Sequence, residues 1–267
     1  MDEQRRRSAR WREDYLRDGF LVVEGVLDAA ELATLGAALE RIEQRVAEES
    51  LPPRLRQYVT LERDQDHAGS ADTDKISNIM ELPLFDPVFR DLIINASVLD
   101  ILEALFGSSE FSFHNYKAIC KMPGGAASFR WHRDLPYLPH TSSNLITCML
   151  CIDPMTTDNG ATVVCPGSHR IADDRIDAGD KDIAEAEVPA ERLTIECPAG
   201  SAVLFDTNIV HGGGPNRSDR PRRNAIGIWA GPDVHPTTAS RYAYEFVMPR
   251  STDPQRQLQV QQTFGTA

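Results

Sequence analysis

The segment Trp131-His132-Arg133-Asp134 and the later run His211-Gly212-Gly213-Gly214 decide how this sequence is interpreted. Side chains alternate faces along a β-strand, so a histidine and an aspartate two residues apart on a strand would point to the same side. A second histidine from a distant strand would complete a set of two imidazoles and one carboxylate. That set leaves three metal positions open and is typical of non-haem Fe(II) oxygenases. A lone H-x-D occurs often by chance, so the prediction depends on its neighbours.

The surrounding sequence has β character. A strand-like run, Leu145-Ile146-Thr147-Cys148-Met149-Leu150-Cys151-Ile152, is followed by the turn pair Asn159-Gly160 and by Pro166-Gly167-Ser168-His169. A second apolar segment, residues 202–206, precedes His211, and Arg222 opens the next one. A guanidinium group at Arg222 would bind a carboxylate through two parallel hydrogen bonds.

Helical and strand-like patterns separate along the chain. Residues 20–26 predict a short strand, and Asp28 is the predicted N-cap of the helix that follows. Residues 87–106 predict a pair of helices, with Ser97 as the cap between them and Gly107 as the residue that ends the second helix. Short strands divided by Gly, Pro and Asn turns fill residues 110–230. We therefore expect a mainly β, α+β fold, in which helices brace one sheet of a double-stranded β-helix, or cupin-like jelly roll.

This pattern predicts a single domain over residues 1–267, with a jelly-roll core at about 110–232 and a helical N-terminal part, 1–109. Residues 51–74 lack periodicity and predict a long loop, which is either a functional lid or a surface excursion. Residues 173–190 predict a second surface insertion. The tail after Arg250 is expected to be frayed.

Composition excludes several classes of protein. Forty acidic against 28 basic residues give a net charge of −12, which argues against binding to nucleic acid or an anionic membrane. No apolar stretch approaches the roughly 20 residues that span a bilayer.

Five cysteines without an apolar leader predict reduced thiols and a cytoplasmic location. Cys148 and Cys151 form a CxxC pair, but three residues apart on a strand they face opposite ways, which favours packing.

The chain resembles the phytanoyl-CoA dioxygenase family of Fe(II)- and 2-oxoglutarate-dependent oxygenases, from Asp18-Gly19-Phe20 to about Trp229. The resemblance implies that His132, Asp134 and His211 bind iron and that Arg222 holds the distal carboxylate of 2-oxoglutarate. Thr147, Met149 and Lys117 match positions that line the co-substrate. Two departures leave its detailed contacts open: Gly213 stands where the family often has a serine that assists the arginine, and Met149 where an aromatic residue often stacks.

The family's chemistry implies Fe(II), 2-oxoglutarate and O2 as cofactor and co-substrates, and hydroxylation of an unactivated C–H bond with release of succinate and CO2. The intact Asp134 argues against halogenation, whereas desaturation, epoxidation and rearrangement stay open. The expected substrate is a small molecule. The CoA-thioester chemistry of the enzyme that gives the family its name is not assumed for this chain. Either a monomer or a homodimer is compatible with the sequence.

Alternative interpretations use the same residues. His132-Arg133-Asp134-Leu135 copies a protein-kinase motif, but no glycine-rich loop or D-F-G accompanies it. A zinc hydrolase would not explain Arg222, and a non-catalytic or zinc-binding cupin-like protein is the remaining alternative.

Several other polar residues have two interpretations each. Lys117 and Lys121 face either an anionic ligand or solvent. Arg130, Tyr137 and Trp229 are candidates to line a substrate pocket. The two aromatic residues, Tyr137 and Trp229, are explained equally well by packing in the core. His140 and His169 are expected to be structural.

Overall fold

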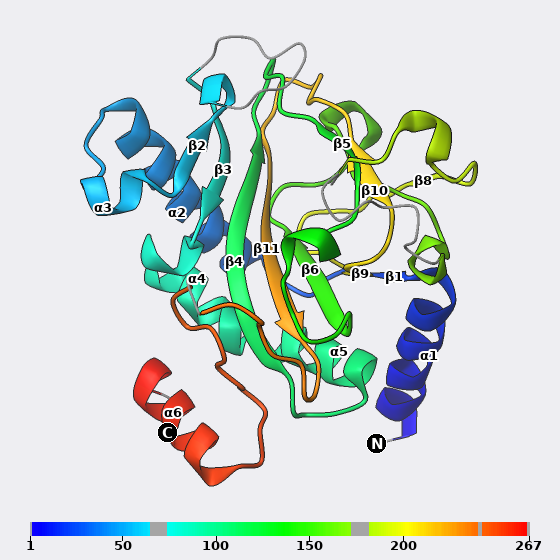
Figure 1. The fold of residues 1–267 in the computed structure, drawn as a ribbon. Coiled ribbons are helices and arrows are strands. Elements are labelled where there is room, and N and C mark those ends of the chain that lie inside the picture. The colour runs from blue at the N-terminus through cyan, green and yellow to red at the C-terminus, as the bar shows by residue number, and fades with distance from the viewer. Residues whose placement is uncertain (1, 65–73, 172–181, 240–241, 266–267) are drawn as a thin grey trace.

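The computed structural model describes residues 2–64, 74–171, 182–239 and 242–265 (Figure 1). Its helices are α1 (Asp2–Asp18), α2 (Ala29–Ala47), α3 (Pro53–Arg56), α4 (Pro87–Asp91), α5 (Ala96–Phe106) and α6 (Pro254–Phe264). Its strands are β1 (Phe20–Val23), β2 (Val59–Leu61), β3 (Ile76–Met80), β4 (Ser112–Lys121), β5 (Phe129–His132), β6 (Leu145–Cys151), β7 (Val163–Val164), β8 (Leu193–Thr194), β9 (Ala202–Asp206), β10 (His211–Gly213) and β11 (Arg222–Ala230).

The strands form two antiparallel sheets. The major sheet has the order β1-β9-β6-β11-β4-β3-β2, and the minor sheet has the order β5-β10-β7-β8. Several neighbours in both sheets are far apart in sequence, as in β1 beside β9 and β10 beside β5. Figure 1 shows β4 and β11 as the long centre of the major sheet, with the minor sheet on the opposite side from α2 and α5. This arrangement confirms the predicted jelly roll with bracing helices.

Alternation along β6 divides the core into two layers. Cys148 and Leu150 are fully buried in the cluster that the major sheet forms with the helices. Met149 and Cys151 point the other way, into a cluster that includes Val164 of the minor sheet. The interior between the two sheets is therefore lined by alternate residues of the major-sheet strands. All five cysteines are free and buried, which supports the packing interpretation of Cys148 and Cys151.

The N-terminal part is less helical than predicted. Strands β1, β2 and β3 all belong to the major sheet, so residues 1–109 supply one edge strand on one side and two strands on the other. The strand predicted at residues 20–26 is confirmed as β1, but β2 and β3 were not predicted, because such short strands depend on their neighbours in the sheet and leave little local signal. Asp28 caps α2 with a capping box, as expected, and Gly107 ends α5 with a positive φ of 69°. The N-cap of α5 is Asn95, however, and not Ser97.

Two predicted irregular regions contain regular structure. Residues 51–64 hold α3 and β2, so the prediction of one long loop was wrong there, and residues 65–73 lie outside the described residues. Of the second insertion, residues 182–190 are described and contain a short 3-10 helix, Glu185–Glu187. The tail is ordered as α6, where Asp253 caps the first turn and Phe264 packs against Tyr244. Among the helices of the described chain, none has the length and apolar character needed to span a membrane.

Candidate active site

Strand register brings the two histidines together. His211 of β10 is the direct antiparallel partner of His132 at the end of β5, and their ring centroids are 4.2 Å apart. Asp134 lies just beyond β5, where the chain turns into the 3-10 helix Leu135–Tyr137. The backbone angles of Asp134 itself, φ −74° and ψ −32°, are helical and not extended. The sequence predicted correctly that His132 and Asp134 lie close together, but the predicted cause, a shared strand face, was wrong. The turn after the strand, and not strand alternation, directs the carboxylate toward the histidines.

Backbone carbonyls orient both imidazoles. The Nδ1 atom of His132 lies 2.7 Å from the carbonyl oxygen of Arg130, and that of His211 lies 3.1 Å from the carbonyl oxygen of Ile209. A carbonyl oxygen can only accept, so each Nδ1 must carry the proton. Each Nε2 is then left with a free lone pair, the form in which histidine binds metals.

Asp134 is held from one side by Thr147. The Thr147 hydroxyl donates a 2.7 Å hydrogen bond to Oδ2 of Asp134, and Thr147 is only 1% exposed. The other oxygen, Oδ1, lies 3.8 Å from Nε2 of His132 and 3.9 Å from Nε2 of His211. The carboxylate thus has one oxygen fixed by the protein and one directed at the histidines.

The three groups fit a metal ion. One ligand atom from each of His132, Asp134 and His211 lies within 4.8 Å of the other two. A point equidistant from three atoms at these spacings lies roughly 2.5 Å from each, close to the ~2.0–2.2 Å of nitrogen and oxygen bonds to divalent metals. A contraction of a few tenths of an ångström would complete the coordination.

The protonation states also suit a metal. Burial, with the neighbouring His132, lowers the pKa of His211 to about 4, which keeps this imidazole neutral near pH 7. Burial by itself would raise the pKa of Asp134, but His211, Lys117, His132 and the Thr147 hydrogen bond outweigh it and lower the pKa to about 2. A neutral imidazole and an ionised carboxylate are the ligand forms that bind without releasing a proton.

An inner cavity adjoins the metal ligands between the two sheets. It is lined by all four residues that the family resemblance assigned to the co-substrate, namely Lys117, Thr147, Met149 and Arg222. Arg222 is 2% exposed and donates a hydrogen bond of 3.1 Å to the carbonyl oxygen of Gly160, and its Nη1 atom lies 2.5 Å from the Asn224 amide, which accepts from it in its hydrogen-bonded orientation. Its Nε atom is buried without a partner. Among the described residues, no carboxylate forms an ion pair with this guanidinium.

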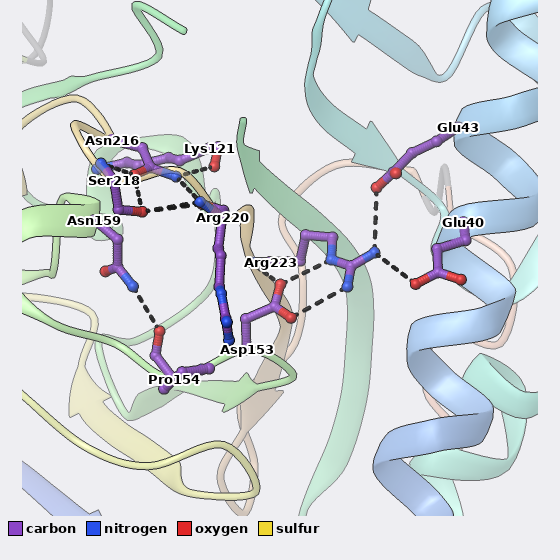
Figure 2. A network of polar contacts seen from close by, with 10 residues as sticks. All are labelled: Glu40, Glu43, Lys121, Asp153, Pro154, Asn159, Asn216, Ser218, Arg220 and Arg223. Atoms are coloured by element: carbon purple, nitrogen blue, oxygen red, sulfur yellow. Dashed lines mark hydrogen bonds and ion pairs between the residues drawn. The ribbon is translucent and has the colours of Figure 1, made fainter. Parts of the chain in front are cut away.

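The next residue, Arg223, has the opposite surroundings. It faces the helices, binds Asp153 through Nε at 2.8 Å and through Nη2 at 3.1 Å, and lies 3.5 Å from Glu43 (Figure 2). A side chain with carboxylate partners needs no ligand, whereas a buried guanidinium without one does. The contrast between these adjacent arginines makes Arg222 the candidate for binding an anionic ligand.

The sequence left Lys121 open between an anionic ligand and solvent, and the structure places it on the inner cavity. The structure excludes a solvent position for it, since the residue is 1% exposed. The signal was present as alternation along β4, where Lys117, Ile119 and Lys121 occupy every second position and all line the cavity.

An outer cavity of about 510 Å³ opens beyond the metal ligands. Arg130 and Tyr137 line it, as the sequence suggested, and Lys117 lies at its boundary with the inner cavity. Arg130 pairs with Asp182 at 3.0 Å, which ties residues 182–190 to the rim. Trp229 is not a pocket residue, because it is fully buried and packs edge-on against Phe111. The size of this space suits a metabolite-sized ligand.

Comparison with known proteins agrees with this geometry. The family model described as Phytanoyl-CoA dioxygenase (PhyH) matches residues 15–224. The chain belongs to this family. As a phytanoyl-CoA dioxygenase family member, it shares 27% identity over 84% of its length, and over 78% of the relative, with the "Probable alpha-ketoglutarate-dependent hypophosphite dioxygenase" of Stutzerimonas stutzeri. The ectoine dioxygenase of Streptomyces avermitilis is 24% identical over 91% of this chain and 86% of its own.

Solved structures share the fold. EctD from S. alaskensis, crystallised with 2-oxoglutarate and 5-hydroxyectoine, superposes with a TM-score of 0.69 at 23% identity over 84% of this chain and 76% of that one. The non-heme alpha ketoglutarate dependent epimerase SnoN from nogalamycin biosynthesis gives 0.68 at 20% identity over 86% and 83%. The fold, the family and the enzyme class predicted from the sequence, a non-haem iron- and 2-oxoglutarate-dependent oxygenase, are thereby confirmed.

Proposed function

We propose that this chain oxidises an unactivated C–H bond of a small-molecule metabolite, with hydroxylation as the default outcome and with release of succinate and CO2. The observation that carries the proposal is the pairing of a two-histidine, one-carboxylate cluster with a buried arginine that lacks a carboxylate partner. A metal site alone would fit many proteins. A metal site beside an unpaired buried guanidinium fits an enzyme that binds an anionic co-substrate next to its metal.

In this proposal His132 and His211 bind Fe(II) through Nε2 and Asp134 through Oδ1. The carbonyl oxygens behind each Nδ1 hold the rings in place, and the Thr147 hydroxyl holds the remaining carboxylate oxygen. Such supporting contacts commonly change metal affinity 10–100-fold. His132, Asp134 and His211 would hold the ion with three protein ligands, which would leave coordination positions open for the co-substrate.

Arg222 binds the distal carboxylate of 2-oxoglutarate at the closed end of the inner cavity. Its guanidinium remains charged, although burial lowers the pKa of Arg222 to about 10. Met149 supplies apolar wall, and Thr147 lies between the metal ligands and this wall. Lys117 lines the same cavity and places a positive charge near Asp134, where it would attract an anionic co-substrate.

When bound, iron and 2-oxoglutarate supply the oxidising chemistry, and the protein's residues orient the reactants and exclude water. The substrate would enter the outer cavity and approach the metal from the side of Tyr137 and Arg130. The relatives named for hypophosphite and for ectoine act on small molecules, which supports a substrate of this size. Their substrates differ in kind, so neither identity is transferred to this chain.

The test is formation of succinate from 2-oxoglutarate by the purified protein in air, with Fe(II), with Zn(II) or without metal. We expect slow uncoupled turnover with Fe(II) alone, and faster turnover when a compound from a metabolite library is accepted. A matched His132→Gln variant should be inactive in both conditions. Binding of Zn(II) without any Fe(II)-dependent decarboxylation would favour a zinc-binding, non-catalytic protein and refute the proposal.

A further inference from the structure

The closed end of the inner cavity contains a second buried cation beside Arg222. Lys121 is 1% exposed, and its Nζ atom donates to the carbonyl oxygens of Gly160, at 2.8 Å, and Gly214, at 2.6 Å. Arg222 donates to the same Gly160 oxygen at 3.1 Å. Because they share one acceptor, the ammonium and guanidinium groups lie within two hydrogen-bond lengths of each other.

Two adjacent buried cations are unfavourable without an anion. Among the residues that the structure describes, Lys121 forms no ion pair with a carboxylate, and neither does Arg222. Burial and repulsion by Arg222 both lower the pKa of Lys121 well below its usual value. An ammonium group has three donors, and carbonyl oxygens occupy two of those on Lys121. A carboxylate placed between the two cations would offset both the burial and the repulsion.

The ammonium group of Lys121 lies in front of Gly213, which has no side chain and belongs to β10, the strand that carries His211. A Cβ atom built at Gly213 would lie 3.1 Å from Nζ of Lys121 and 3.0 Å from the carbonyl oxygen of Ala161. The space in front of residue 213 is thus occupied by the lysine ammonium group.

We infer that Lys121 is a second anchor for the distal carboxylate of the co-substrate, acting together with Arg222. This inference rests on the proposed function, since it concerns the same co-substrate. Figure 2 shows how the lysine backbone is fixed: the carbonyl oxygen of Lys121 accepts a 2.7 Å hydrogen bond from the Asn216 side chain. The consequence is selectivity for keto-acids that carry a second carboxylate.

The competing explanation is structural, because Lys121 also ties the loops at Gly160 and Gly214 together. Two ligands separate these roles: 2-oxoglutarate, and 2-oxopentanoate, which has the same chain length but lacks the distal carboxylate. Each is titrated anaerobically by calorimetry into the Fe(II)-loaded protein. The variants are Lys121→Met and Lys121→Gln, the second of which retains donors for the two carbonyls. Lys75→Met is the matched control, since Lys75 donates to the Pro123 carbonyl oxygen at 2.6 Å away from the site.

We expect both Lys121 variants to bind 2-oxoglutarate about tenfold to a hundredfold more weakly, as for loss of a charge-assisted hydrogen bond. Their affinity for 2-oxopentanoate should equal that of the wild type, and Lys75→Met should change neither. Equal losses for both acids, or no loss for 2-oxoglutarate, would overturn the inference.

The outcome for Arg222 distinguishes this failure from failure of the proposed function. If Arg222→Met loses 2-oxoglutarate selectively but the Lys121 variants do not, the co-substrate site stands and Lys121 has no part in it. If the wild type binds 2-oxoglutarate no more tightly than 2-oxopentanoate, the proposed co-substrate site itself is wrong.

Discussion

Replacing Thr147 by valine tests whether the metal site depends on the residue behind its carboxylate. The substitution keeps the shape of the side chain and removes only the hydroxyl that donates to Oδ2 of Asp134 at 2.7 Å. Thr147 is 1% and Asp134 8% exposed, so water cannot easily replace the lost donor. A hydrogen bond to a buried charged group contributes about 1.5–3 kcal/mol. Fe(II) affinity should therefore fall roughly tenfold to a hundredfold, the range found when such supporting contacts are lost.

The assay is an anaerobic calorimetric titration of Fe(II) into wild type, Thr147→Val and Thr147→Ser. The serine variant retains the hydroxyl and should bind Fe(II) much like the wild type, which separates hydrogen bonding from packing. Circular dichroism confirms that each variant is folded before titration. An unchanged Fe(II) affinity in Thr147→Val would show that Asp134 needs no support from β6, and the reasoning about the site would be refuted.

Four further outcomes follow from contacts in and around the site. His132→Gln should abolish measurable Fe(II) binding while leaving the circular dichroism spectrum unchanged, and tight binding by this variant would contradict the ligand assignment. Arg222→Met should weaken 2-oxoglutarate binding by about 2–5 kcal/mol in an anaerobic titration, because a buried charge pair is lost. Arg223→Met should instead lower the free energy of unfolding in urea by about 3–5 kcal/mol and leave 2-oxoglutarate affinity unchanged, since it strands the Asp153 carboxylate. Glu81 is 2% exposed, and burial raises its pKa to about 7 from the usual 4.5, so wild-type stability should fall between pH 4.5 and about 7 as this carboxyl ionises in the unfolded chain first. Glu81→Gln should flatten that part of the pH–stability curve, and an unaltered curve would place the ionisation elsewhere.

Much of the site could be predicted because its chemistry is carried by residue types that are informative in themselves. The two histidines, the aspartate and Arg222 were identified from their order and surroundings, and the structure brings all four to one place. The sequence could not predict the register that sets His211 opposite His132, since pairing between distant strands is a tertiary property. Nor could it predict that Asp134 belongs to a turn, where alternation no longer applies.

The errors in the fold have the same origin. Strand β2 covers only Val59–Leu61 and pairs with β3, so its stability comes from neighbours and not from its own pattern. Helix α6 was missed because none of its residues is fully buried and its many glutamines gave no amphipathic pattern. Lys121 was left undecided between ligand and solvent because its alternation with Lys117 and Ile119 shows a shared strand face but does not show which face is buried.

The division of the site between the two sheets has a consequence for engineering. Both histidines are mounted on the minor sheet, whereas Thr147, Lys121 and Arg222 are mounted on the major sheet. Under the proposed function, grafting the minor sheet onto another scaffold would transfer the two histidines without the residues proposed to bind the keto-acid, and grafting the major sheet would transfer those residues without the histidines. Directed evolution of this enzyme is therefore best aimed at the rim around Arg130 and Tyr137, where substitutions can alter substrate choice without changing the spacing between the layers.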